Sequence, residues 1–177
     1  MGLDVSRASA QGRERVACVF ATGFEDLRGQ FTRIDSCGRG GQSLKEKWSS
    51  GPRTYLGVAA EGFPNMFMIT GPGSPSVLGN MPTSIEQHVD WICDCLTHAA
   101  ESGAQLIEAT AAAESDWGAH VQELANDTLF PQTDSWYLGA NIPGNPQVFL
   151  PYIGGFGTSR GLCDVVANYC TEGFVMA

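Results

Sequence analysis

The sequence predicts an α/β fold in which short buried strands are combined with about three helices and long loops. Two short apolar runs, at residues 16–21 (VACVFA) and 67–70 (FMIT), end at turn-forming residues, as strands buried on both faces do. Later segments repeat apolar residues every three or four positions, which is the period of a helix packed on a core. The 22 glycines in 177 residues indicate extensive loops between these elements.

The charge of the chain excludes several classes of partner. A formal net charge of -9 and a pI near 4.6 would repel a phosphate backbone, so we expect neither a nucleic acid nor an anionic membrane surface as a partner. No apolar stretch approaches the roughly 20 residues that span a bilayer. The six cysteines are scattered, with no signal peptide before them, so we expect reduced, buried thiols in a cytoplasmic protein.

The first third of the chain carries weaker signals. Residues 1–15 are polar and aperiodic, which predicts a poorly anchored leader before a domain at residues 16–177. Residues 28–48 alternate weakly around a glycine-rich loop, which favours short strands or a hairpin. The turn-rich segments that follow lead into the strand at residues 67–70.

A glycine-rich loop follows that strand at residues 71–76 (GPGSPS). Its glycines permit positive φ or close backbone approach, and its prolines fix φ and remove donors. A strand, such a loop and a helix N-terminus together suit an anion or an electron-rich ring edge. An ordinary strand-to-helix connection is the alternative, because Ser76 stands where the dinucleotide fingerprint G-x-G-x-x-G requires its third glycine.

The next helix is predicted from capping signals and from an apolar stripe. Thr83 with Glu86, and Ser84 with Gln87, both fit a capping box that opens a helix. Gly103 is expected to end it. The residues expected to face the core are Ile85, Val89, Ile92, Leu96 and Ala99. Cys93 and Cys95 lie two positions apart in this helical pattern, so they point in different directions and we expect no metal site there.

Two further helices are expected in the second half of the chain. Residues 106–108 can form a short strand, after which Thr110 caps a helix. The long loop at residues 129–151 carries Trp136, and such a loop is usually functional or mobile, although Trp136 could instead plug the core. Gly173 is expected to end the last helix. The apolar faces of the two helices are Ala113, Trp117, Val121 and Leu124, and Leu162, Val165, Val166 and Tyr169.

A hydrolase site is weakly indicated. Ser74 or Ser76 could act with His88 or His120, but no G-x-S-x-G elbow is present. Both histidines are expected on helix surfaces. We therefore assign no catalytic residue from the sequence.

Five motifs, in order along residues 16–177, resemble the Baeyer-Villiger class of flavin-dependent monooxygenases. The motifs are residues 20–24 (FATGF), 51–57 (GPRTYLG), 71–76 (GPGSPS), 84–91 (SIEQHVDW) and 135–144 (SWYLGANIPG). The resemblance implies FAD and NADPH (NADP) as cofactors, bound by two dinucleotide-binding domains. It also implies insertion of one oxygen atom beside the carbonyl of a small-molecule ketone, to give an ester or a lactone.

The same resemblance assigns roles to residues of this chain. It places Gly71, Pro72, Gly73, Ser74 and Met81 beside the flavin, with the N-terminus of the following helix facing the pyrimidine edge. It places Ser76, Val77 and Leu78 along the substrate pocket. Trp136 resembles the tryptophan of a mobile loop that folds over NADP.

The chain departs from the family pattern in what it lacks. Both G-x-G-x-x-G fingerprints, the F-x-G-x-x-x-H-x-x-x-W motif and the active-site arginine are absent from the sequence, and neither Arg53 nor Arg160 is taken as a replacement. The chain is therefore interpreted as the C-terminal part of such an enzyme, inactive alone, with the N-terminal nucleotide-binding domains as its missing partners. The alternative is a non-catalytic remnant, or an assembly or binding module that pairs with a separate chain through exposed sheet edges.

Overall fold

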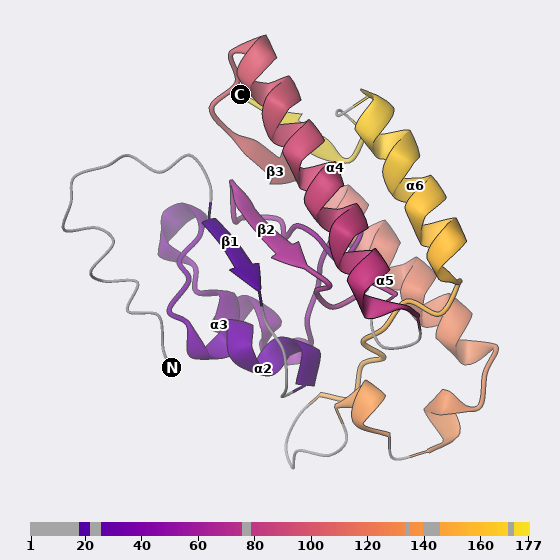
Figure 1. Cartoon of the computed structure of the whole chain (residues 1–177). Helices are drawn as coiled ribbons and strands as arrows, with labels where there is room; N and C mark the ends of the chain where they lie inside the picture. The colour runs from indigo at the N-terminus through magenta and orange to yellow at the C-terminus, as the bar shows by residue number, and fades with distance from the viewer. Residues whose placement is uncertain (1–17, 22–25, 76–78, 134, 140–145, 170–171) are drawn as a thin grey trace.

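The computed structural model describes residues 18–21, 26–75, 79–133, 135–139, 146–169 and 172–177 (Figure 1). Within these ranges the chain mixes helices with short strands, as the predicted α/β class requires. In chain order the elements are β1 (Cys18–Ala21), α2 (Asp26–Arg33), α3 (Leu44–Lys47), β2 (Met66–Ile69), α4 (Met81–Ser102), β3 (Ile107–Ala109), α5 (Ala111–Asn126), α6 (Phe156–Tyr169) and β4 (Phe174–Met176), with short 3-10 turns between some of them.

The described strands form two small sheets. β1 pairs in parallel with β2, with Cys18 opposite Met66, and β3 pairs antiparallel with β4, with Ile107 opposite Met176. The two strands predicted from apolar runs are therefore confirmed in position. Among the described residues β1 has one strand neighbour, whereas Phe67 of β2 also forms an isolated antiparallel bridge with Ala59. β4 was not predicted. The leader predicted at residues 1–15 lies outside the described residues.

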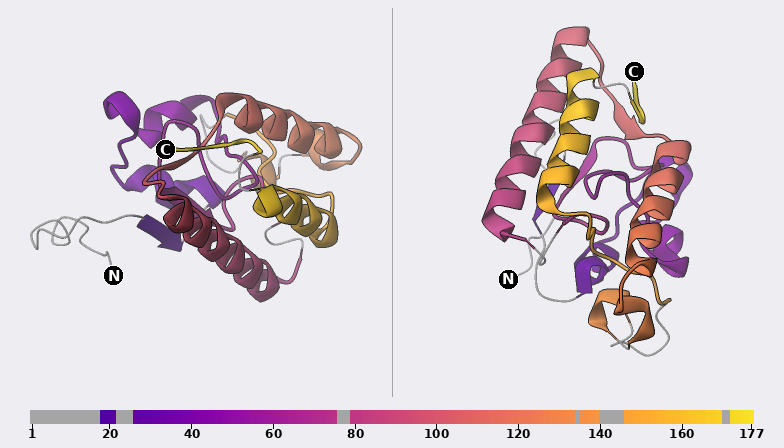
Figure 2. Two further views of the ribbon diagram at one scale, coloured as in Figure 1. Left: turned by 90° about the horizontal axis from the view of Figure 1, so that it is seen from above. Right: turned by 90° about the vertical axis from the view of Figure 1, so that its right-hand side faces the viewer.

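The helices surround a central region of turns. α4 and α6 lie side by side and run in roughly the same direction, while α5 lies across the central turns from them (Figures 1 and 2). Among the described residues, no helix is both long and apolar enough to cross a membrane. The cytoplasmic location stays a prediction.

The prediction of strands or a hairpin at residues 28–48 is wrong. The region forms α2 and α3, joined by a turn in which Gly40 has φ +65°, and its one β contact is an isolated bridge between Cys37 and Ser43. The Ser43 hydroxyl accepts the N–H of Glu46 and so caps α3. The apolar residues of this region do not alternate along strands. Phe31, Leu44 and Trp48 instead pack from helical turns into a second core cluster, where they are buried.

α4 begins before either predicted capping box. Its N-cap is Asn80, whose Oδ1 accepts the N–H of Thr83 at 3.3 Å, and Pro82 occupies the first turn. Ser84 is buried inside the helix and donates to the carbonyl of Asn80. The predicted end at Gly103 is confirmed, because this glycine closes the helix with φ +75°.

The predicted buried face of α4 is offset by about one residue. Ile85 and Val89 are 39% and 38% exposed, although both were expected in the core. Polar side chains occupy part of the buried face in their place. The buried residues of α4 are Ser84, His88, Trp91, Ile92, Cys95 and Ala99.

The second and third helices are confirmed in place, with corrections to their faces. Thr110 caps α5 as predicted, but Glu114 joins Trp117 and Val121 on the buried face. On α6, Leu162 and Val165 are exposed, so that part of the predicted face is wrong.

The end of α6 and the cysteines also differ from the sequence expectation. Gly173 does not end α6, because it lies in the turn before β4 with φ +77°. Cys95 and Cys163 are buried, whereas Cys37 and Cys93 are exposed, so the expectation of buried thiols holds for only part of the set. Burial raises the pKa of the Cys163 thiol to about 11, which keeps it protonated.

Candidate functional site

The glycine loop after β2 is anchored by backbone hydrogen bonds to a distant segment. Gly73 donates its N–H to the carbonyl of Leu150 at 2.7 Å, and Tyr152 donates its N–H to the carbonyl of Ser74 at 2.8 Å. These bonds are short and come from both sides of Pro151, so residues 148–152 run along the loop and support it.

Side chains of the core satisfy other carbonyls of the loop. The Thr54 hydroxyl donates to the carbonyl of Pro72 at 2.5 Å, and the indole Nε1 of Trp117 donates to the carbonyl of Gly73 at 3.2 Å. Ser74 donates its hydroxyl to the carbonyl of Gly71 at 2.7 Å. All of these loop residues are buried, so the loop is held by protein groups rather than open to solvent.

The two glycines of the loop are required by internal packing. At Gly73, φ is +81°, and a Cβ would lie 2.9 Å from Nε1 of Trp117 and 3.1 Å from Oγ1 of Thr54. At Gly71, a Cβ would lie 2.7 Å from the carbonyl oxygen of Gly57. The expectation of positive φ or close backbone approach is therefore met, and the approaching groups belong to the chain itself.

The side chain of His88, on the buried face of α4, contacts the start of this loop and does not lie on the helix surface as predicted. Its side chain is fully buried, and Nδ1 accepts the backbone N–H of Thr70 at 3.0 Å. Burial lowers the pKa of His88 to about 4, so the imidazole is neutral at physiological pH.

The hydrolase arrangement is not formed by the described residues. The hydroxyl of Ser74 is bonded to a backbone carbonyl, and the ring of His120 packs at 5.7 Å from Trp117 and 5.8 Å from Tyr152. Ser76 lies outside the described residues, as do Val77 and Leu78, so their predicted pocket-lining role stays a prediction.

The N-terminus of α4 follows the loop. Met81 is half-buried in the first turn, and that turn contains no acidic side chain. The positive end of the helix dipole is therefore not neutralised by its own first turn, although Asn80 caps the N–H of Thr83. This end of the helix is compatible with a negatively charged or electron-rich group.

Trp136 lies in a 3-10 turn (Trp136–Leu138) capped by the hydroxyl of Ser135. Its indole is 41% exposed and stacks on the ring of Tyr137, with 4.2 Å between the ring centroids. Leu138, rather than the tryptophan, is buried here. Trp136 therefore does not plug the core and has surface available for a ligand.

The segment at residues 148–152 connects this aromatic turn to the glycine loop. Val148 donates its N–H to the carbonyl of Leu138 at 3.1 Å, and Leu150 donates its N–H to the carbonyl of Tyr137 at 2.8 Å. The Gln122 carboxamide holds Phe149 in both directions, donating to its carbonyl at 2.9 Å and accepting its N–H at 3.3 Å. Two sites predicted separately from the sequence thus share one support.

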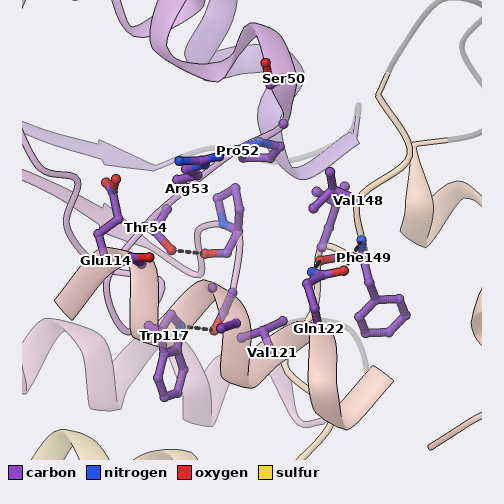
Figure 3. A pocket seen from close by; sticks show the side chains of 17 residues that line it. Ser50, Pro52, Arg53, Thr54, Glu114, Trp117, Val121, Gln122, Val148 and Phe149 are labelled. Atoms are coloured by element: carbon purple, nitrogen blue, oxygen red, sulfur yellow. Dashed lines mark hydrogen bonds between the residues drawn. The ribbon is translucent and has the colours of Figure 1, made fainter. Parts of the chain in front are cut away.

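A cavity of about 290 Å³ lies behind the glycine loop, between α5 and residues 148–150 (Figure 3). Figure 3 shows Thr54 and Trp117 bonded to the loop on one side of the cavity and Gln122 bonded to Phe149 on the other. Arg53 lies on its rim and is exposed. The other arginine considered from the sequence, Arg160, is paired with Asp164 on α6 at 3.6 Å.

One buried charge lies beside this cavity. The Glu114 carboxylate accepts the backbone N–H of Glu61 at 2.9 Å and lies 3.0 Å from Nζ of Lys47.

No group of three His, Cys, Asp or Glu side chains in the described part of the chain could hold a metal ion. The described residues therefore form a hydrogen-bonded support for two loops.

Sequence signals had pointed to the two loops but not to the residues that hold them. Thr54 and Trp117 were known only as a turn residue and a core residue. Gln122 carried no signal at all, because a glutamine on a helix is an ordinary surface residue. Their roles depend on contacts between segments that are distant in sequence.

No protein-family model matches the chain, but it is similar to several characterised monooxygenases. It is 43% identical over 158 residues to a phenazine N-monooxygenase of Lysobacter antibioticus, covering 89% of this chain and 29% of that protein. It is 40% identical over 156 residues to a cyclohexanone 1,2-monooxygenase of Acinetobacter sp, covering 88% and 28%. It is also 40% identical over 160 residues to an acetone monooxygenase of Gordonia sp., covering 90% and 30%.

The solved structures that resemble the chain are also monooxygenases. A steroid monooxygenase bound to NADP is 44% identical with a TM-score of 0.79, and the match covers 88% of this chain and 28% of that one. A cyclohexanone monooxygenase from Rhodococcus sp. Phi1 bound to NADP+ is 40% identical with a TM-score of 0.82, covering 89% and 29%. The chain thus spans less than a third of the length of the relatives it matches.

Proposed function

We propose, on the premise that this chain is homologous to a segment of the flavin-dependent Baeyer-Villiger monooxygenases, that it forms one wall of the cofactor and substrate site of such an enzyme. The whole enzyme would use FAD and NADPH to insert oxygen beside a ketone carbonyl. This chain would contribute the glycine loop, the N-terminus of α4 and the aromatic turn at Trp136.

One observation carries this proposal. The glycine loop and the aromatic turn, which the resemblance assigns to flavin and to NADP, are both bonded to residues 148–152. Leu150 bonds to both, because it accepts from Gly73 and donates to Tyr137. A shared support would keep the two cofactor-facing segments in a fixed relation, and catalysis by positioning requires such a relation.

The described residues fit a flavin as one wall of its site. When bound, the flavin supplies the redox chemistry of oxygen insertion. The N-terminus of α4 has no acidic residue in its first turn, so it can stabilise negative charge on an adjacent ring edge. The loop at Gly71–Ser74 has its polar groups bonded within the chain, so it would offer a rigid packing surface to the ring.

Trp136 and the ketone pocket complete the proposal. The half-exposed indole of Trp136 would cover the nicotinamide cofactor and exclude water, which limits loss of the oxidant as peroxide. Ser76, Val77 and Leu78 would line the ketone pocket. One homologous structure contains cyclohexanone, and this supports a ketone as the class of substrate.

A chimeric enzyme tests the proposal. Residues 16–177 would replace the matching segment of the Acinetobacter cyclohexanone 1,2-monooxygenase, and flavin content and ketone-dependent NADPH oxidation would be measured. We expect a yellow, FAD-containing protein that oxidises at least one ketone. A folded chimera that retains no FAD, while the parent enzyme treated identically does, would refute the proposal.

A second candidate is an assembly module that pairs with a separate chain. Ile85 and Val89 form an exposed apolar pair on α4, and β1 has one strand neighbour among the described residues. The purified chain can be tested with FAD by thermal melting and flavin fluorescence. Cooperative melting without any effect of FAD would favour this second candidate for the isolated chain.

A further inference from the structure

Thr70, the residue that connects β2 to the glycine loop, has a strained backbone. Its φ is +52°, in the left-handed region, and its side chain is β-branched and buried. A β-branched residue rarely adopts this conformation, because its side chain is crowded against the backbone there. Such strain persists only where the surroundings hold it, and it is concentrated at functional sites.

His88 is the group that holds this turn. Its Nδ1 accepts the backbone N–H of Thr70 at 3.0 Å, and the imidazole is fully buried. The bond ties the start of the loop to α4, and the end of the loop continues into the same helix at Met81. The start of the loop is therefore fixed to α4 through His88.

The tautomer of the neutral His88 ring follows from this bond. Because Nδ1 accepts an N–H, the neutral ring must carry its proton on Nε2. Nε2 has no hydrogen-bond partner among the described residues, and leaving a buried donor unpaired is unfavourable. A side chain present only to fill space would avoid that cost, so Nδ1 is the atom that explains a histidine at this position.

The conformation of the loop depends on this first turn. The pairing of β2 with β1 ends at Ile69, so the backbone leaves the sheet at Thr70. Three and four residues later, Gly73 and Ser74 form backbone hydrogen bonds with Leu150 and Tyr152. A relaxed Thr70 would rotate the peptide that precedes Gly71. Gly71 has little freedom to adjust, because a Cβ at this glycine would already lie 2.7 Å from the Gly57 oxygen.

We propose that His88 is a positioning residue, which holds Thr70 in its left-handed turn and so sets the surface that the Gly71–Ser74 loop presents to the flavin. The flavin part of this inference rests on the proposed function. The contact between His88 and Thr70 is a property of this chain alone, so the two parts can be tested separately.

Two matched substitutions test the contact in the 177-residue chain. His88→Gln keeps an acceptor oxygen at a similar reach, whereas His88→Met has similar length and no such acceptor. Long-range ¹H–¹⁵N NMR spectra should show the His88 tautomer with its proton on Nε2. Amide exchange of Thr70 should be slow in the wild type and in His88→Gln, and at least about tenfold faster in His88→Met, which corresponds to losing one hydrogen bond.

Each result of this first experiment is decisive for the contact. Equal protection of Thr70 in the folded Met and Gln variants would overturn the proposal, and so would the opposite tautomer. If the Met variant does not fold, the Gln variant decides: native Thr70 protection supports the acceptor role, and its loss overturns it.

The same pair of substitutions in the chimera tests the consequence for the flavin. We expect the Gln variant to keep the absorption spectrum of the bound flavin, and the Met variant to shift it and to release more peroxide per NADPH at equal flavin content. An unchanged spectrum and coupling in the Met variant, despite faster Thr70 exchange, would overturn the positioning role. A chimera with native His88 that binds no flavin would refute the proposed function, while Thr70 exchange would still decide whether His88 fixes the loop.

Discussion

Gly73 and Leu150 are joined by a backbone hydrogen bond of 2.7 Å, and this bond links the two halves of the candidate site. Leu150 also donates its N–H to Tyr137, which stacks on Trp136. A disturbance on one side can therefore reach the other through a single extended segment.

Replacing Gly73 with alanine should destabilise the chain by roughly 2–4 kcal/mol, combining left-handed backbone strain with overpacking. The added Cβ would lie 2.9 Å from the Trp117 indole nitrogen, where φ is +81°. Urea unfolding followed by circular dichroism measures the loss. Gly79→Ala is the matched control, because a Cβ there meets nothing within 4 Å, and it should change stability by less than about 0.5 kcal/mol. Equal stability of both variants would contradict the packing at Gly73.

Local signals predicted the elements whose cause is local. The apolar run before Gly71 gave a strand, Thr110 capped α5 with its own hydroxyl, and Gly103 ended α4 with a positive φ. In each case the deciding contact lies within a few residues in the sequence. The loop at Gly71–Ser74 was located for the same reason, because glycine and proline mark turns directly.

Contacts between distant segments decided what the sequence could not predict. An apolar stripe through Ile85 and Val89 was a sound helical pattern, yet the helix is rotated so that His88 is buried against Thr70. Burial of a histidine can be predicted only if its hydrogen-bond partner is known, and the partner of His88 lies outside α4. The pairing of β4 with β3 likewise depends on the partner strand.

Replacing Gln122 with leucine should loosen the support between the two loops. The substitution leaves the N–H and the carbonyl of Phe149 without their partners, at a cost of about 1–2 kcal/mol. Amide exchange at Phe149 and Leu150 should accelerate, and urea unfolding should give the change in stability. Gln122→Glu keeps an acceptor for the N–H and should show a smaller effect. Unchanged exchange in the leucine variant would show that Gln122 is not needed there.

Replacing Lys47 with methionine should destabilise the chain by about 3 kcal/mol, because it leaves the buried carboxylate of Glu114 without its cation. The two side chains are only 9% and 7% exposed, so solvent cannot replace the lost partner. Adding Glu114→Gln to this variant removes the unpaired charge and should recover part of the loss. A double-mutant cycle by urea unfolding measures the coupling, and additive effects would contradict the pairing.

Lowering the pH should destabilise the chain through His88. Its pKa is about 4 in the folded state and 6.5 in the unfolded state, so the unfolded state binds more protons between these values. Stability is therefore complete above about pH 6.5 and falls as the pH decreases toward 4, by roughly 3 kcal/mol in total.

Unfolding experiments across this pH range measure the effect of His88. His88→Gln should remove most of the slope, whereas His98→Gln, which removes an exposed histidine from the same helix, should retain it. Identical slopes in the wild type and in His88→Gln would assign the pH dependence to other groups.

Replacing Trp136 with alanine in the flavin-containing chimera should raise the peroxide released per NADPH and weaken the use of NADPH. An aromatic contact of this kind contributes about 0.5–1.5 kcal/mol, so closure over the cofactor should weaken roughly 2- to 10-fold. Peroxide and product yields measure the coupling, and Trp136→Phe should retain most of it because a ring can still stack on Tyr137. Leu129→Ala changes a side chain that is 73% exposed and should have no effect. If the alanine variant couples as well as the wild type does, the cofactor-covering role of Trp136 is wrong, although its exposed position in the turn is unaffected by that result.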